Sequence, residues 1–126
     1  MTVGKVPMVL VVEDEEIVRE MVCMDLVDAG FSVREAATGD EAIRILQEES
    51  AGEEQIGVLF TDIRMPGSLD GWSLAERARV LKPQLQVLYA SGYSAEPARE
   101  VPGSFFITKP YRTTLLLEMI RRLGIQ

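Results

Sequence analysis

Short apolar runs alternate with longer amphipathic segments along almost the whole chain, and this alternation restricts the fold more than any other feature. Five runs have the length of strands: Met8–Val12, Phe31–Glu35, Gly57–Thr61, Gln86–Ala90 and Ser104–Thr108. Segments with a helical pattern follow them at Glu15–Ala29, Gly39–Glu49, Gly71–Leu81, Ala95–Val101 and Thr113–Leu123. Five strand–helix pairs of this kind predict an α/β fold that is doubly wound around a parallel sheet.

Residues that favour helix ends support several of these boundaries. Ala29-Gly30 closes the first helical segment, and Lys82-Pro83 ends the third. The fourth segment differs from the others because Pro97, Pro102 and Gly103 crowd it. We therefore expect the fourth helix to be short or poorly formed.

Length and charge limit the kinds of protein that fit this sequence. A chain of 126 residues is expected to form one domain. Thirteen Lys and Arg residues against twenty Asp and Glu residues give a formal net charge of −7, which argues against direct binding of nucleic acid. No apolar stretch is long enough to suggest a membrane span, and no signal-peptide pattern opens the chain, so we expect a cytoplasmic protein.

Two residue types exclude several common catalytic and metal sites. The chain contains no histidine, which excludes Ser-His and Cys-His nucleophile pairs and histidine zinc sites. Cys23 is the only cysteine, so neither an internal disulfide nor a cysteine metal cluster can form. Any chemistry must therefore come from carboxylates, hydroxyls and cations.

Acidic residues mark the ends of two predicted strands. Asp62 ends the apolar run that begins at Val58, and Glu13-Asp14 directly follows Met8–Val12. Ligands of parallel sheets bind outside the carboxyl ends of the strands. If these two strands are neighbours, three carboxylates converge and repel one another, and a divalent cation would relieve this repulsion. Oxygen ligands of this kind favour Mg²⁺.

A second interpretation of the first acidic cluster needs no metal. Asp14 would cap the first helix, and Glu15 and Glu16 would interact with the positive end of that helix. This interpretation explains Asp14 equally well and explains the two glutamates better. It leaves Asp62 unexplained.

The remaining strand ends add a hydroxyl and a cation. Ser91-Gly92 follows the fourth predicted strand, and Lys109-Pro110 follows the fifth. Each signal is weak alone, because a Ser-Gly pair usually forms a turn and a lysine at a strand end is usually solvated. Together with the acids of two other strands, they predict a metal-dependent site for transfer of an anionic group.

In this order, these residues resemble the receiver domain of bacterial two-component response regulators, over Val9 to Leu123. The matching motifs are Glu13-Asp14, Asp62 with Met65-Pro66-Gly67 and Asp70-Gly71, Ser91, and Lys109-Pro110. The resemblance implies a flavodoxin-like sheet of order 2-1-3-4-5 flanked by five helices, and a cis peptide bond between Lys109 and Pro110. We also expect a single receiver domain over residues 1–126, with its core at 8–123, and no output domain, because only three residues follow Leu123. If the sequence is instead a piece of a longer protein, it could be the receiver of a hybrid kinase or of a larger regulator.

The resemblance further implies a function for each site residue. Asp62 would accept a phosphoryl group from a sensor histidine kinase or a histidine phosphotransfer protein. Mg²⁺ would be held by Asp14, Asp62, the backbone carbonyl of Arg64 and, through a water, Glu13. Lys109 would neutralise the transferred group, and phosphorylation would alter a surface that binds a downstream protein whose identity the sequence does not reveal.

A hydroxyl and an aromatic residue would carry the signal in this family. Ser91 would donate a hydrogen bond to the phosphoryl group, and the ring of Phe106 would move into the space that this change opens. The alternative is that Phe105 and Phe106 simply alternate across a strand, with one of them in the core. Both interpretations predict an aromatic residue at this position.

The first helical segment suggests where a partner binds. Its apolar residues cover more than the single stripe needed to pack on a sheet, so we expect part of them to be exposed. They are Ile17, Val18, Met21, Val22, Met24, Leu26, Val27 and Ala29. This surface could bind the helix bundle of a kinase, although these residues could instead fill a thick layer of the core.

Two other functions fit parts of the sequence. Phosphohydrolases related to haloacid dehalogenases also place a nucleophilic aspartate after an apolar strand, but they need a second aspartate two residues later, where this chain has Arg64. A receiver-like module that is never phosphorylated would act only by docking, and it would not need the acids, the hydroxyl and the lysine. We therefore expect a phosphoacceptor signalling domain rather than an enzyme.

Overall fold

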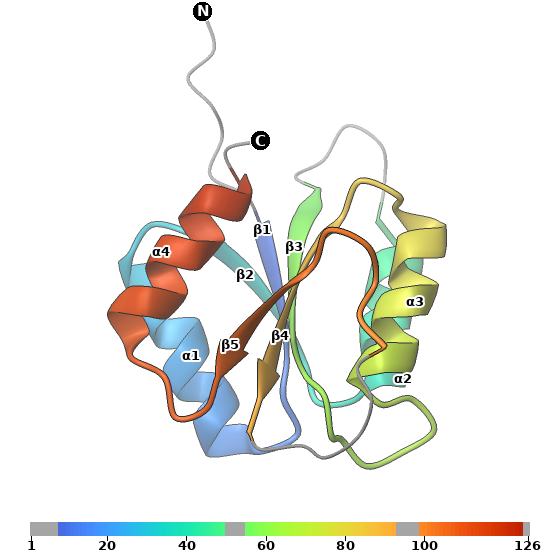
Figure 1. The fold of residues 1–126 in the computed structure, drawn as a ribbon, viewed down its shortest axis with the longest axis horizontal. Coiled ribbons are helices and arrows are strands. Elements are labelled where there is room, and N and C mark those ends of the chain that lie inside the picture. The colour runs from blue at the N-terminus through green and yellow to red at the C-terminus, as the bar shows by residue number, and fades with distance from the viewer. Residues whose placement is uncertain (1–7, 50–54, 93–98, 125–126) are drawn as a thin grey trace, which may run out of the picture.

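Five parallel strands form one sheet in the computed structural model, which describes residues 8–49, 55–92 and 99–124 (Figure 1). The strands are β1 (Met8–Val12), β2 (Ser32–Ala36), β3 (Ile56–Asp62), β4 (Gln86–Ser91) and β5 (Phe105–Thr108). The helices are α1 (Glu16–Asp28), α2 (Gly39–Gln47), α3 (Gly71–Leu81) and α4 (Thr113–Gly124). The strand order is β2-β1-β3-β4-β5, which confirms the expected topology.

The predicted elements agree with these bounds to within two residues, with one exception. The short helix expected at Ala95–Val101 lies mostly outside the described residues, and its described part, 99–101, is not helical. The label α4 therefore belongs to the helix that we predicted at Thr113–Leu123. None of the helices in the described part of the chain is both long and apolar enough to cross a membrane.

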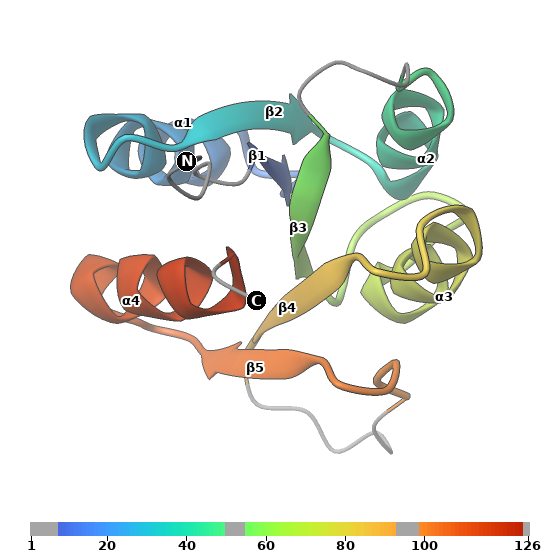
Figure 2. The same cartoon turned by 90° about the horizontal axis from the view of Figure 1, so that it is seen from above.

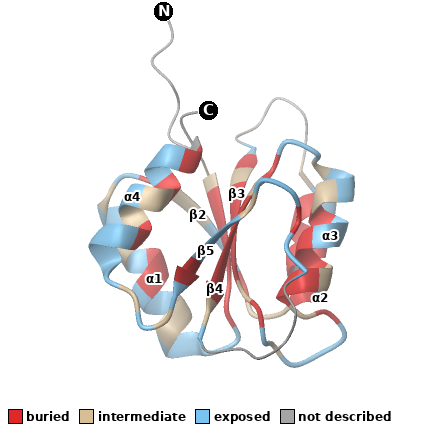
Figure 3. Ribbon diagram, viewed as in Figure 1, coloured by how far each residue is buried: buried red, intermediate tan, exposed pale blue. Residues whose placement is uncertain are grey.

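The sheet is covered on both faces, which explains why its central strands are almost uniformly apolar. Helices α1 and α4 lie on one face, and α2 and α3 lie on the other (Figure 2). Along β1, Val9 and Val11 belong to the core beneath α1 and α4, whereas Leu10 and Val12 belong to the core beneath α2 and α3. The buried residues form a continuous band through the sheet (Figure 3).

Side chains cap the first turns of α2 and α3 but not that of α1. The Thr38 side chain accepts a hydrogen bond from the Glu41 N–H at 3.1 Å, and Asp70 accepts one from the Ser73 N–H at 2.8 Å. At α1 the residue in the capping position is Glu15, and no side chain caps it. The interpretation of Asp14 as a helix cap is therefore wrong.

Helix α3 begins in direct contact with the backbone at the end of β3. The Gly71 N–H donates to the Ile63 carbonyl at 2.7 Å. A Cβ atom on Gly71 would collide with the Asp62 carbonyl oxygen and would lie only 2.7 Å from the Ile63 Cα. Glycine at this position therefore lets the helix start pack against the strand end that carries Asp62.

We expect Gly71→Ala to lower the free energy of unfolding by about 2–3 kcal/mol, because the new methyl group must push backbone atoms apart. Gly92→Ala is the matched control, because no atom lies within 4 Å of a Cβ built there. Its effect should stay within about 0.5 kcal/mol. Urea unfolding followed by circular dichroism measures both, and equal effects would contradict the close packing at Gly71.

Candidate functional site

Acids from two neighbouring strands meet at the carboxyl edge of the sheet. Strands β1 and β3 pair in parallel with Val12 opposite Thr61, and the next residue along each strand is acidic. One carboxylate oxygen from each of Glu13, Asp14 and Asp62 lies within 4.8 Å of the others. The register of the sheet thus brings together the three acids that the sequence placed at strand ends.

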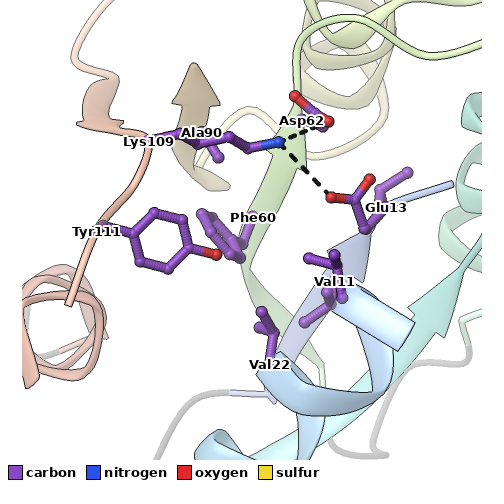
Figure 4. Close-up of a pocket in the computed structure, with 10 residues that line it drawn as sticks. Val11, Glu13, Val22, Phe60, Asp62, Ala90, Lys109 and Tyr111 are labelled. Carbon is purple, nitrogen blue, oxygen red and sulfur yellow. Dashed lines mark hydrogen bonds and ion pairs between the residues drawn. The ribbon is translucent and has the colours of Figure 1, made fainter. Parts of the chain in front are cut away.

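Lys109 reaches these acids from the opposite side of the site. Its Nζ donates to Asp62 Oδ2 at 2.9 Å and lies 3.7 Å from Glu13 Oε1 (Figure 4). The lysine follows β5 directly, and its backbone N–H donates to the Ser91 carbonyl at 2.8 Å. The peptide bond between Lys109 and Pro110 is cis, as the resemblance implied.

The site holds more negative charge than its lysine neutralises. Glu13 is only 6% exposed. Burial, the adjacent Asp14 carboxyl group and the negative charge of Asp62 raise the pKa of Glu13 from 4.5 to about 7. Burial lowers the pKa of Lys109, but its hydrogen bond to Asp62 and the charges of both acids outweigh burial and raise this pKa overall. The ammonium group therefore stays charged, while Glu13 is poised to exchange a proton.

The backbone orients the second oxygen of Asp62. Asp62 Oδ1 accepts a hydrogen bond from the Ile63 N–H at 2.9 Å, so both carboxylate oxygens have a donor. Beneath the acids lies a cavity of about 10 Å³, about the smallest space that holds a water molecule. A phosphoryl group is larger than this cavity and would have to bind on the solvent side of the site.

Ser91, at the end of β4, and Arg64, in the loop after β3, border the site. Ser91 ends β4, and its hydroxyl donates to the Gly92 carbonyl at 2.8 Å. Strand pairing places Ala90 opposite Asp62, so the serine is one residue beyond the acid on the adjacent strand. Arg64 lies in the loop between β3 and α3, two residues after Asp62, with an exposed side chain.

Phe106 packs against two aromatic residues of the core but is itself partly exposed. Its ring centroid lies 5.1 Å from that of Tyr89 and 5.9 Å from that of Trp72. Phe105 and Phe106 are 45% and 40% exposed, so the interpretation that one of them is a core residue is wrong. Both lie on β5, an edge strand, which among the described strands pairs only with β4. Edge strands do not have the two covering layers that bury side chains at the centre of the sheet.

Two residues of this region were not found from the sequence. Tyr111 lines the cavity beneath the acids, and burial raises the pKa of its hydroxyl. Its place two residues after Lys109 was the only available signal. Arg19 donates from Nη1 to the Glu13 carbonyl at 2.8 Å. No sequence motif predicts this contact, because it joins a helix residue to the backbone just after a strand.

Comparisons with known proteins agree with the fold. Residues 9–121 match the family described as the response regulator receiver domain. The receiver protein CpdR of Brucella abortus is 31% identical over 121 residues, which cover 93% of this chain and 96% of CpdR. The crystal structure of a response regulator receiver protein from Sinorhizobium medicae has 31% identity and a TM-score of 0.85, covering 96% of each chain.

Some relatives are much longer proteins. The sensor kinase CckA of Brucella abortus is 34% identical over 119 residues, which cover 91% of this chain but 12% of CckA. Other curated relatives are matched over only 24% or 25% of their length. The match covers nearly all of this chain in every one of these cases. The chain therefore belongs to the response regulator receiver domain family, the signalling domains of two-component systems.

Proposed function

We propose that Asp62 accepts a phosphoryl group from the phosphohistidine of a sensor kinase or a phosphotransfer protein. The phosphohistidine lies outside these 126 residues, because they contain no histidine. The observation that carries this proposal is the position of the Asp62 carboxylate, which lies at a strand end, 2.9 Å from the Lys109 ammonium and beside two further acids. This arrangement surrounds one carboxylate with the groups that phosphoryl transfer needs.

The reaction would form one bond and break another. A carboxylate oxygen of Asp62 attacks phosphorus, and the bond from phosphorus to the donor's imidazole nitrogen breaks. The Lys109 ammonium, which already bonds Asp62 Oδ2, provides a positive charge for the oxygens of the transferred group. The product is an aspartyl phosphate, and its hydrolysis by water resets the domain.

The acids at this site also fit a magnesium ion. Their ligand atoms are hard carboxylate oxygens within 4.8 Å of one another, and their mutual repulsion is only partly offset by Lys109. Glu13, Asp14 and Asp62, with the Arg64 carbonyl, would hold the ion. When bound, Mg²⁺ supplies positive charge for the oxygens of the phosphoryl group.

Phosphorylation would change the conformation of Ser91 and Phe106, which would transmit the signal to the surface. The Ser91 hydroxyl now bonds a neighbouring carbonyl, and it would instead donate to the phosphoryl group on the adjacent strand. Phe106 contacts the rings of Tyr89 and Trp72, but 40% of its own surface stays exposed, so it is loosely packed. A shift of the β4 end would therefore move a ring that is not locked in the core.

The exposed face of α1 is a candidate surface for the phosphodonor. Ile17, Met21, Met24 and Val27 are 73%, 60%, 64% and 57% exposed, and their spacing places them along one side of the helix. The helix begins two residues after Asp14. A helical bundle that packs on this apolar stripe could therefore bring its phosphohistidine close to the acids.

Incubation with a small phosphodonor and Mg²⁺, followed by intact mass measurement, tests the proposed chemistry. We expect one phosphoryl group per chain, which is lost at alkaline pH because an acyl phosphate hydrolyses there. Asp62→Asn should abolish the adduct, because it removes the nucleophile. The matched control is Asp28→Asn, which changes an exposed acid at the end of α1 and should be phosphorylated like the wild type.

The same experiment separates the competing functions. A wild-type chain that forms no adduct with any donor would contradict the proposal and favour a module that acts only by docking. Steady turnover of varied phosphomonoesters would favour a phosphohydrolase.

The raised pKa of Glu13 predicts a pH dependence of stability. Because this pKa is about 7 in the folded state and 4.5 ordinarily, the protonated form contributes stability that is fully present below pH 4.5 and is lost as pH rises through 7. With a chelator present, the free energy of unfolding should fall between about pH 5 and pH 8 by on the order of 1–3 kcal/mol. Urea unfolding across this range measures it.

Two additions make this pH test specific. Mg²⁺ should restore stability most strongly near the upper end of the range, where Glu13 is ionised. Glu13→Gln should flatten the decrease, whereas Glu20→Gln, at an exposed position of α1, should keep it. A decrease that persists unchanged in Glu13→Gln would show that another group causes it.

Trp72 provides a readout of the proposed switch, because it is the only tryptophan and its ring centroid lies 5.9 Å from that of Phe106. We expect phosphorylation to change the tryptophan emission of the wild type. Phe106→Leu should reduce this change by about half or more while phosphorylation itself persists, because the moving ring is gone. Phe105→Leu is the control and should respond like the wild type. An unreduced change in Phe106→Leu would argue against the switch.

A further inference from the structure

Arg19 is a largely buried cation that the proposed phosphoryl transfer does not use. Its side chain is only 15% exposed, although it lies on a helix at the edge of the site. Its Nη1 donates to the Glu13 carbonyl at 2.8 Å, and its Nε donates to Glu35 Oε1 at 3.0 Å. One guanidinium therefore links α1 to the chain beyond β1 and to the end of β2.

The bond to the Glu13 carbonyl acts on the position of Asp14. The carbonyl of Glu13 and the nitrogen of Asp14 belong to one planar peptide group, so holding the oxygen limits the rotation of the whole group. The Glu13 N–H is itself held by the Ala36 carbonyl at 3.2 Å. The backbone of Glu13 is thus fixed on both sides, by a strand neighbour and by Arg19.

Among the contacts described for this turn, no other side-chain hydrogen bond of comparable length fixes it. No side chain caps the start of α1, and the Glu15 N–H reaches Glu13 Oε2 only at 3.4 Å. Asp14 is exposed. A hydrogen bond from a charged, partly buried donor is the strongest restraint on the peptide group between the two acids.

Glu35 explains why an arginine suits this position. The guanidinium presents several N–H groups in a rigid plane, so one group can donate to the carbonyl while another donates to Glu35. Glu35 comes from β2 and is about half exposed, and it supplies the negative charge that a buried cation needs. A lysine would keep the charge without this fixed geometry.

We propose that Arg19 is a positioning residue for the metal-binding acids. By holding the peptide group between Glu13 and Asp14, it keeps their carboxylates at the spacing from Asp62 that a divalent cation requires. This inference rests on the proposed magnesium site. Partners that orient metal ligands in this way typically raise metal affinity by 10-fold or more.

Titration of the unphosphorylated domain with MgCl₂, followed by two-dimensional NMR, tests this role without any phosphodonor. Arg19→Ala should raise the Kd for Mg²⁺ by about 10-fold. Arg19→Lys should fall between this variant and the wild type, because the charge is retained and the geometry is not. Arg34→Ala, which removes an exposed arginine next to Glu35 on β2, should bind Mg²⁺ like the wild type.

A second readout separates positioning from a merely structural role. With a small phosphodonor, the Mg²⁺ concentration that gives half the maximal phosphorylation rate should rise with the Kd in Arg19→Ala, while the rate at saturating Mg²⁺ stays within about twofold. Should Arg19→Ala not fold, Glu35→Gln takes its place, with an expected rise in Kd of about threefold.

The possible outcomes are distinct. If Arg19→Ala, or Glu35→Gln in its place, lowers the free energy of unfolding but leaves the Kd for Mg²⁺ at the wild-type value, Arg19 supports only the fold and the proposal is overturned. If the wild-type domain itself does not bind Mg²⁺, both this inference and the proposed magnesium site are overturned. If the wild type binds Mg²⁺ but Asp62 is not phosphorylated, the proposed function fails. The role of Arg19 in metal binding is then decided by the Kd of Arg19→Ala for Mg²⁺ alone: a raised Kd supports it and a wild-type Kd overturns it.

Discussion

The repulsion between three carboxylates at one edge of the sheet is the constraint on which the site depends. Val12 and Thr61 pair across β1 and β3, so the chain must place the following acids, Glu13 and Asp62, side by side. Core packing on both faces of the sheet enforces this register, because a slip of one residue would move each side chain of the strand to the opposite face and disrupt the close packing of both cores. Burial energy thus holds together charges that would otherwise separate.

The contacts of Lys109 that partly offset this repulsion also connect the strand ends to one another. Lys109 bonds Asp62 and approaches Glu13, and its own backbone is bonded to Ser91 at the end of β4. The cation, the hydroxyl and the acids are therefore mechanically linked through short strand ends. A change of charge at Asp62 would therefore alter the electrostatic interactions of the lysine, the hydroxyl and the other acids. The loosely packed Phe106 lies on β5, one strand beyond Ser91.

The strand ends and the elements around them could be predicted from the sequence because apolar runs, turn residues and acids mark them locally. The strand order came from a family resemblance, since pattern alone does not order strands. The exposure of both Phe105 and Phe106 was not predicted, because alternation along a strand predicts one buried and one exposed residue, although the strand order implied by the resemblance already placed the fifth strand at an edge. The contact of Arg19 with the Glu13 carbonyl was equally hidden, because it depends on how a helix packs and carries no motif.

Paramagnetic broadening by Mn²⁺, used in place of Mg²⁺, tests most directly whether these strand ends form one divalent-cation site. At low Mn²⁺, the amide signals next to Glu13, Asp14 and Asp62 should broaden first in the wild type, and Asp14→Asn should weaken this effect at both strand ends together. The contrary result is broadening that is equally strong at exposed acids elsewhere, such as Asp40 and Glu118, and that does not change in Asp14→Asn. Such a result would show that the clustered carboxylates bind cations no differently from the rest of an acidic surface.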